Sequence, residues 1–266
     1  MSAPETFQIP LETAELYESK FVPALFADWA PHVVDMADIG PGQSVVDVAC
    51  GTGIVARTAA ARVGNAGRVV GVDLNQAMLT VAARVCPDVE LRRADVTDLP
   101  FEAATFEAVL CQMALMFFPD RQAAIREMGR VVKAEGTVVI MVPSSLGAQP
   151  AYRQLVHLAA RHAGPEAVAM LSTYWSCGDL DELIATVQGA GLDVLATRTR
   201  LGTARFASID EFVAVEVEST PVRERLTDGE YDTLRREAHG VLGAFTAGHS
   251  TAEIPIEGHL VAARPG

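Results

Sequence analysis

Three aspartates and a glycine-rich turn between residues 44 and 95 have the residue types and spacing of a ligand-binding site. Asp47 lies inside an apolar run, the turn 49–53 (Ala-Cys-Gly-Thr-Gly) follows it, and Asp73 and Asp95 each close a later apolar run. Glycines let backbone approach a ligand closely, and the helix after such a turn presents free N–H groups to an anion. Carboxylates accept hydrogen bonds from hydroxyl and amino groups. The pattern therefore predicts a site in which backbone N–H groups and carboxylates contact one ligand.

The apolar runs around these residues predict the elements that position them. Residues 44–73 read as strand, turn, helix and strand, which is a βαβ unit. The predicted strands span residues 44–49, 68–73, 89–95, 105–112 and 137–142. The predicted helices between them span residues 53–62, the segment between an Asn75 N-cap and Pro87, and residues 120–132. Strands that alternate with helices form a parallel, doubly wound α/β sheet, and ligands bind at the carboxyl ends of its strands.

The segments outside this alternation are mainly helical. Apolar residues recur at helical spacing over residues 11–39, and a further helix is expected over residues 150–162. Capping patterns predict helices after Asp179, Ser208 and Thr227, each of which precedes a glutamate by three residues. Strands are predicted over residues 192–200 and 253–264.

The glycine turn by itself leaves two cofactor classes open. Gly51-x-Gly53-x-x-Ala56, followed by Asp73, also satisfies the dinucleotide-binding pattern, so an NAD-dependent oxidoreductase is one alternative. Asp47 inside the first strand argues against it, because a dinucleotide fold has no need for a carboxylate there. Asp95 at a third strand end also argues against it, and the sequence nominates no hydride-transfer residue.

The segment Asp47-x-Ala-Cys-Gly-Thr-Gly53 closely resembles motif I of class I S-adenosylmethionine (SAM) methyltransferases. The resemblance covers about residues 40–145 well and the rest more loosely, and Ala49 stands where the family has its first glycine. It implies SAM as cofactor and S-adenosylhomocysteine (SAH) as product. It also implies a Rossmann-like methyltransferase fold, with a doubly wound, seven-stranded, mostly parallel sheet and a helical cap. Its last strand would be antiparallel and lie between strands five and six.

The same resemblance implies how the chain is divided. The expected parts are an N-terminal helical lid (1–40), the SAM-binding core (41–146), a first cap insertion (147–177), a core helix with strand six (178–200), a second cap insertion (201–252) and the final core strand (253–266). The two insertions and the lid would together form the cap.

The resemblance also implies which residues hold the cofactor. Tyr17 and Phe21 would cover it from the lid, Asp47 would receive its amino group directly or through water, and Asp73 would accept both ribose hydroxyls. Asp95 would accept from the adenine amino group. The remaining expected contacts are the turn residues Ala49, Cys50, Gly51 and Gly53 at the methionine portion, Leu74, Met78, Ala94 and Val96 around the adenine, and Cys111 and Gln112 beside the transferring methyl. Each aspartate has an alternative role as a cap of its own turn or strand end.

The methyl acceptor is less well defined. The segment from Gln112 to Arg121 resembles the ubiquinone and menaquinone biosynthesis methyltransferases, which implies a small, mainly apolar acceptor and O- or C-methylation. The aromatic residues expected in the cap suit such a pocket, although each can instead pack the cap's own core: Tyr174, Trp175, Phe206, Phe212 and Phe245. His162 and His239 are weak candidates for a base, and we assign none. A SAM-binding scaffold that transfers no methyl group is a third alternative.

Composition and charge argue against several classes of binding partner. The formal net charge is −13 with only 21 lysines and arginines, which argues against nucleic acid and against an anionic membrane surface. Strand four also lacks the Asp/Asn-Pro-Pro-aromatic segment of methyltransferases that modify bases. No apolar run is long enough to insert into a membrane. The four cysteines have neither disulfide nor metal spacing, and no signal segment begins the chain, so we expect a cytoplasmic protein without a metal. Oligomeric state stays open.

Overall fold

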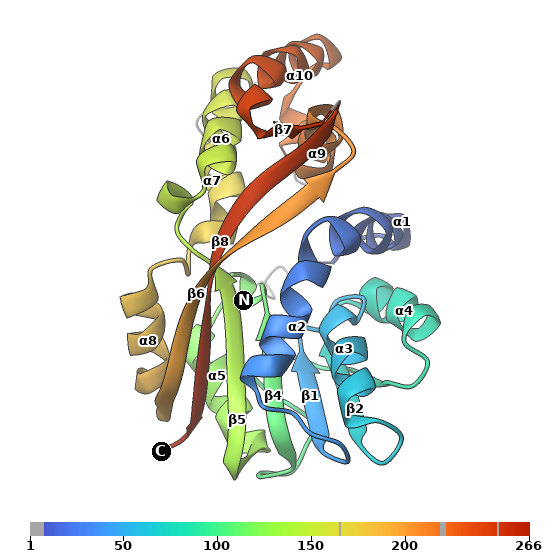
Figure 1. The fold of residues 1–266 in the computed structure, drawn as a ribbon, viewed down its shortest axis with the longest axis vertical. Helices are drawn as coiled ribbons and strands as arrows, with labels where there is room; N and C mark the ends of the chain where they lie inside the picture. The colour runs from blue at the N-terminus through green and yellow to red at the C-terminus, as the bar shows by residue number, and fades with distance from the viewer. Residues whose placement is uncertain (1–7, 165, 219–221, 249) are drawn as a thin grey trace, which may run out of the picture.

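A computed structural model describes residues 8–164, 166–218, 222–248 and 250–266. Its centre is one sheet with the strand order β3-β2-β1-β4-β5-β8-β6 (Figure 1). The strands are β1 (Ser44–Val48), β2 (Arg68–Asp73), β3 (Glu90–Arg93), β4 (Phe106–Gln112), β5 (Val132–Pro143), β6 (Leu192–Phe206) and β8 (Thr251–Pro265). The two-residue β7 (Thr246–Ala247) pairs with β8 and makes it an eight-stranded sheet.

The strand directions confirm the predicted topology. β3, β2, β1, β4 and β5 run parallel, whereas β8 lies antiparallel between β5 and β6. Strands of a parallel sheet are covered on both faces and are therefore apolar throughout. β1 illustrates this, because Val45, Val46 and Val48 are all buried. The strand order reverses between β1 and β4, and a crevice opens at such a point beyond the carboxyl ends of the strands.

Helices cover both faces of the sheet. On one face, α2 (Ala27–Met36) and α3 (Ile54–Val63) contribute buried side chains to a core that includes Val45 and Leu110. On the other face, α5 (Arg121–Val131) and α8 (Leu180–Gly189) pack on Val46 and Val109. The helix α4 (Gln76–Val85) begins after Asn75, whose side-chain oxygen accepts from the N–H groups of Ala77 and Met78, as predicted.

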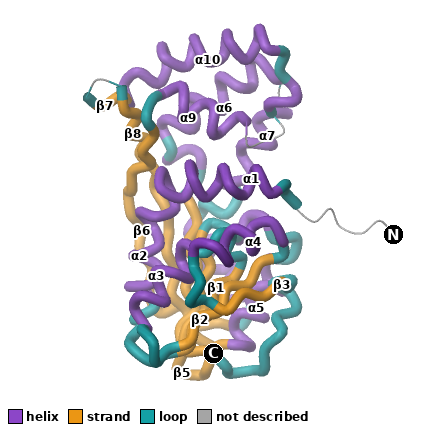
Figure 2. Tube along the Cα trace, turned by 90° about the vertical axis from the view of Figure 1, so that its right-hand side faces the viewer, coloured by secondary structure: helices purple, strands orange, loops and turns teal. Residues whose placement is uncertain are grey.

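The first helical segment is continuous. It comprises α1 (Leu11–Leu16), the π-helical η1 (Tyr17–Phe26) and α2, which we together call the N-terminal helix. Figure 2 shows α1 crossing between α4 of the core and the helices at the far end of the molecule. Ion pairs join it to the core, from Glu15 to Arg84 at 2.6 Å and from Glu18 to Arg57 at 3.0 Å.

The far end of the molecule is formed by α6 (Pro150–Ala163), α7 (Glu166–Ser172), α9 (Ile209–Glu218) and α10 (Asp228–Leu242), which we call the cap (Figure 1). Capping interactions begin its helices as predicted. The Ser208 hydroxyl accepts from the Glu211 N–H, and Thr227 and Glu230 form a complete capping box. The division into lid, core and cap stays a proposal.

The strands β6 and β5 run several residues further than predicted. β6 continues from the expected end at Arg200 to Phe206, where it pairs with Ala252 of β8. β6 and β8 therefore leave the sheet as a ribbon that reaches the cap (Figure 1). Each strand supplies the hydrogen-bond partners of the other, so the ladder's length depends on pairing across the chain and not on a local stop signal. β5 likewise begins at Val132 and not at Thr137. In the described ranges, no helix has the length and apolar character needed to cross a membrane.

Candidate functional site

A cavity of about 330 Å³ lies at the carboxyl ends of the parallel strands, between the core, the N-terminal helix and the cap. Many residues predicted to hold the cofactor line it: Tyr17, Phe21, Ala49, Gly51, Asp73, Leu74, Met78, Ala94, Asp95, Val96 and Gln112. Asp47, Cys50, Gly53 and Cys111 do not; Asp47, Cys50 and Cys111 are buried, and Gly53 begins α3. The topology has therefore brought the carboxyl ends of β1 to β5 and a helix from the start of the chain to one space.

The turn between β1 and α3 has an unusual backbone. Ala49, Gly51 and Gly53 all have φ in the left-handed region, at 55°, 54° and 88°. Glycine enters this region freely, whereas a residue with a Cβ atom pays a steric cost. Ala49 therefore carries strain at the position where the resembling family has glycine. The conformation turns the chain sharply, so that Gly51 forms part of the cavity wall.

Asp73 joins this turn to the start of α4. One carboxylate oxygen accepts from the Gly51 N–H at 2.8 Å and the other from the Asn75 N–H at 2.8 Å. Burial raises the pKa of Asp73, and these backbone bonds partly oppose the shift. Each carboxylate oxygen has a second lone pair, so the side chain can also accept from a ligand in the cavity. The two readings of Asp73, local cap and ligand contact, are thus compatible.

Asp47 is placed differently from Asp73. It is 2% exposed and accepts from the Ala56 N–H in the first turn of α3 at 2.9 Å. Burial raises its pKa to about 8. The structure does not bring Asp47 to the cavity wall, and it serves as a cap for α3. Asp95 lies two residues beyond β3, at the cavity edge, where its side chain also accepts from the N–H and hydroxyl of Thr97.

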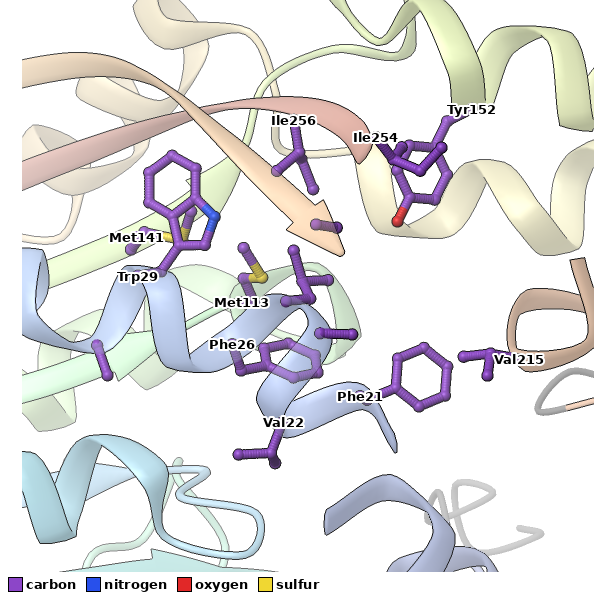
Figure 3. Packing of buried hydrophobic residues seen from close by; sticks show 14 of the residues in the cluster. Phe21, Val22, Phe26, Trp29, Met113, Met141, Tyr152, Val215, Ile254 and Ile256 are labelled. Carbon is purple, nitrogen blue, oxygen red and sulfur yellow. The ribbon is translucent and has the colours of Figure 1, made fainter. Parts of the chain in front are cut away.

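The N-terminal helix covers the glycine turn with aromatic rings. The Tyr17 ring lies 5.0 Å from that of Phe26 and 5.9 Å from that of Phe21, measured between centroids. A Cβ atom added to Gly51 would lie 3.6 Å from the Tyr17 hydroxyl oxygen, which places this hydroxyl directly over the turn. Figure 3 shows Phe21 extending towards Val215 of α9, so the same helix also contacts the cap.

Gln112 at the end of β4 carries an unsatisfied polar atom. Its Nε2 donates to the Phe26 carbonyl at 3.1 Å, while its buried Oε1 has no hydrogen-bond partner within the described ranges. A buried acceptor without a partner costs free energy, so a donor from a ligand or from an ordered water would satisfy it. Together with the lone pairs of Asp73 and the Tyr17 hydroxyl, this donor and acceptor set fits the hydroxyl, amino and carboxylate groups of SAM.

The cap contributes residues that sequence reasoning did not nominate. Glu216 of α9, which is 7% exposed, lines the cavity and accepts from the Tyr152 hydroxyl of α6 at 3.0 Å. Burial raises the pKa of Glu216 to about 7. The signal was present, because Glu216 interrupts the apolar run from Phe212 to Val217 in the way that Asp47 interrupts its own.

The predicted cap residues fall into two groups. Tyr174 and Trp175 line the cavity, whereas Phe206 and Phe212 lie in the buried core with ring centroids 5.2 Å apart, and Phe245 packs against that core, partly buried. The candidate bases do not line the cavity. Each of them instead contacts a carboxylate outside the cavity wall. The His162 Nε2 lies 3.3 Å from Glu237 Oε2, and the His239 Nε2 lies 2.9 Å from Asp210 Oδ2.

Similarity to known proteins concentrates on the core. Residues 45–136 match the family model of a methyltransferase domain. Demethylmenaquinone methyltransferase of Bacillus cereus is 34% identical over 132 residues, which cover 47% of this chain and 56% of that protein. The chain thus spans about half the length of the curated relatives that it matches.

Solved structures share the fold over most of the chain. A Bacillus halodurans protein is 20% identical, with coverage of 89% of this chain and 99% of that one and a TM-score of 0.61. A SAM-dependent methyltransferase of Thermotoga maritima is 15% identical, with coverage of 96% and 97% and a TM-score of 0.57. At these identities the likeness concerns the fold.

Proposed function

We propose that the chain binds SAM as class I methyltransferases do and transfers a methyl group to a small, mainly apolar acceptor, since residues 45–136 match a methyltransferase domain and the chain has the fold of such proteins. The observation that carries the proposal is one continuous cavity. It joins Asp73 and the glycine turn, where the resemblance places the cofactor, to apolar and aromatic walls from the N-terminal helix and the cap.

The chain's own part in the reaction is binding, orientation and exclusion of water. SAM supplies an electrophilic methyl group when bound. Asp73 would accept hydrogen bonds from the ribose hydroxyls, the Gly51 backbone would contact the methionine portion, and Tyr17 would cover the site above the turn. The Gln112 Oε1, which has no hydrogen-bond partner among the described residues, would accept a hydrogen bond from the bound ligand. Such positioning, with reacting atoms about 3–3.5 Å apart and water excluded, lowers the barrier without an elaborate set of catalytic groups.

The acceptor class is supported by two independent features. The walls near the cap are aromatic, as with Phe117 and Tyr174, whose rings meet edge to face at 5.3 Å. The curated relative is named demethylmenaquinone methyltransferase, which agrees with the resemblance to quinone-biosynthesis enzymes around residues 112–121. We therefore propose O- or C-methylation of a small apolar metabolite, and the net charge of −13 makes a nucleic acid a poor substrate.

Calorimetric titration with SAM and SAH tests the proposal. We expect both to bind, and Asp73→Ala to weaken binding about a hundredfold, because two hydrogen bonds to a carboxylate contribute roughly 1.5 kcal/mol each. Asp98→Ala, an exposed aspartate outside the cavity wall, is the matched control and should bind as the unmodified chain does.

Two outcomes separate the alternatives, and one control shows that the variant is folded. Absence of binding heat with both SAM and SAH would contradict the methyltransferase proposal. Because Asp73 also accepts from two backbone N–H groups, circular dichroism must show that Asp73→Ala is folded, and Asp73→Asn, which keeps one acceptor oxygen, should lose less affinity. Binding of SAM without turnover across a broad set of acceptors would favour the scaffold alternative.

A further inference from the structure

The cap end of the cavity holds a buried carboxyl group that the cofactor does not need. Glu216 lies on α9, on the far side of the cavity from the glycine turn and Asp73, and its side chain reaches the cavity wall. Tyr152 of α6 donates its hydroxyl to one carboxylate oxygen of Glu216 at 3.0 Å. Burying a carboxyl group costs several kilocalories per mole, so a stable cap would be easier to build with an apolar side chain here.

Aromatic rings surround this carboxyl and connect it to the cofactor end. The Tyr152 ring packs on Trp175 at 4.7 Å and, edge to face, on Phe212 at 5.2 Å. Tyr174 also lines the cavity, and its ring meets that of Phe117 edge to face. Burial raises the pKa of Tyr174, with a smaller contribution from the Glu216 charge, and burial likewise raises the pKa of Tyr17, which lies over Gly51. Glu216, Tyr174 and Tyr17 therefore line one cavity.

The same helix provides an internal comparison. Glu218, two residues after Glu216, also accepts from a tyrosine hydroxyl, that of Tyr231 at 2.8 Å. Glu218 is exposed and does not line the cavity. A glutamate–tyrosine pair thus occurs twice on α9, once in a solvated position and once against the substrate space. Only the second is placed to meet an acceptor.

We propose that Glu216 is a catalytic residue that accepts the proton of an acidic hydroxyl group, phenolic or enolic, on the methyl acceptor. The proposal rests on the methyltransferase function above. The hydroxyl oxygen forms the bond to the methyl carbon, and the carbon–sulfur bond breaks with its electron pair going to sulfur. The hydroxyl proton goes to the Glu216 carboxylate and then to solvent once the product has left. The net products are the methyl ether, SAH and a proton.

A hydroxyl fits this site better than an amine. A buried carboxylate stabilises an ammonium ion, and the ammonium nitrogen has no electron pair with which to attack the methyl group. With a phenol, the same carboxylate removes the proton and increases the electron density on oxygen. Positioned proton transfer of this kind contributes about 10²–10⁴-fold to a rate. The aromatic walls formed by Tyr152, Tyr174 and Trp175 suit a planar, apolar ring.

The titration of the carboxyl group agrees with this role. Burial raises the pKa of Glu216 to about 7 and outweighs the opposing hydrogen bond from Tyr152. Among the described residues, Tyr152 from α6 and Tyr174 from η4 (Thr173–Trp175) are titratable groups that interact with it, and burial raises the pKa of both tyrosines. A base must be deprotonated, so kcat/KM for a hydroxyl acceptor should rise as pH increases through about 7.

A binding experiment tests recognition without turnover. The chain saturated with SAH is titrated at pH 8 with 1-naphthol and with 1-methoxynaphthalene, which differ only in the hydroxyl group. We expect 1-naphthol to bind about tenfold more tightly, because the ether has no hydroxyl group with which to donate a hydrogen bond to the Glu216 carboxylate. Glu216→Leu should abolish this preference, and the control Glu218→Leu should keep it. Equal affinity of the unmodified chain for the two probes, with SAH bound, overturns the proposal for Glu216 alone. Failure to bind SAH overturns the methyltransferase function as well.

A turnover experiment tests proton transfer. In Glu216→Gln the amide oxygen still accepts from the substrate hydroxyl but cannot take its proton at neutral pH. We expect kcat for 1-naphthol to fall about 10²–10⁴-fold, with KM changed less than about threefold, and the pH dependence near 7 to disappear. Glu218→Gln should leave all three unchanged. The expected product is 1-methoxynaphthalene. Ring-methylated product, preference for 1-naphthylamine, or a fully active Glu216→Gln overturns the proposal.

Discussion

At the scale of single residues, both the backbone conformation of Gly53 and the side chain packed against it require glycine at this position. Its φ is 88°, and a Cβ atom there would lie 2.5 Å from the Cys86 sulfur. The sulfur cannot easily move, because Cys86 is buried and its Sγ donates to the Ala82 carbonyl at 2.9 Å. The turn that places Gly51 in the cavity wall thus depends on Gly53, which does not itself line the cavity.

We predict that Gly53→Ala destabilises the fold by more than its backbone conformation alone requires. Gly191 has a φ of 89° with nothing within 4 Å of an added Cβ, so Gly191→Ala reports the left-handed penalty of about 1–2 kcal/mol alone. Gly53→Ala should cost at least about 1 kcal/mol more in urea unfolding, and Cys86→Ala in the same chain should recover part of the difference. Equal costs for Gly53→Ala and Gly191→Ala would show that the Cys86 contact relaxes freely.

At the scale of elements, Asp47 connects a strand to the helix that follows it. Its side chain extends from β1 and accepts from Ala56 in the first turn of α3, where helical N–H groups lack partners within the helix. This bond holds the start of α3 against the sheet and fixes the path of the intervening turn. It does so at an electrostatic cost, because the carboxyl is buried.

This cost predicts a pH dependence of stability. Burial raises the pKa of Asp47 from 3.8 to about 8, so between these values the folded chain retains a proton that the unfolded chain has lost. Stability should therefore be greatest below about pH 4 with respect to this group, and should fall by roughly 1.4 kcal/mol per pH unit as pH rises towards 8.

Asp47→Asn isolates this contribution. The amide oxygen still accepts from Ala56, and the neutral side chain cannot ionise, so the variant should be more stable than the unmodified chain at pH 7 and should show a shallower decline with pH. Chemical unfolding at a series of pH values measures both. Asp38→Asn, which removes an exposed carboxylate, serves as the control for the slope. An unchanged slope in Asp47→Asn would assign the pH dependence to Asp73 and Glu216, whose pKa values burial also raises.

At the scale of the whole molecule, one cavity is walled by three parts of the chain. The core contributes the strand ends, the N-terminal helix contributes Tyr17 and Phe21, and the cap contributes Tyr152 and Glu216. The β6–β8 ribbon joins the sheet to the cap, and Figure 2 shows α1 between them. A ligand in this cavity therefore contacts all three parts at once.

We predict that SAH raises the midpoint of thermal unfolding of the whole chain in a single transition. At a concentration a hundred times its Kd, a ligand that binds only the folded state adds about 2.7 kcal/mol, which corresponds to roughly 5–10 °C for a chain of this size. Differential scanning calorimetry measures the shift, and Asp73→Ala is the control that should lose most of it. A transition that splits in two with SAH present would show that the cap unfolds independently of the ligand.

The sequence by itself determined the core and its cofactor end. Valine-rich runs become strands because only a buried sheet satisfies both their backbone and their side chains, and the alternation with helices leaves a parallel order. Local signals such as Asn75 and Thr227 set where helices begin, since a capping side chain bonds its own first turn. The strand ends carrying Asp73 and Asp95 meet at one edge for the same topological reason.

Tertiary structure decided the features that depend on contacts between residues distant in the chain, namely the direction of side chains, the length of strands and burial. Asp47 and Asp73 look alike in sequence, yet the packing of α3 turns Asp47 away from the cavity while Asp73 lines it. The length of β6 is set by its ladder with β8, from a segment far along the chain. Glu216 lines the cavity, and Glu218 is exposed, because one face of α9 is buried against the cavity and the Tyr152 side chain of α6. Burial and strand pairing depend on contacts that form only in the folded chain, so the sequence alone did not predict the cap end of the cavity, where Tyr152 and Glu216 lie.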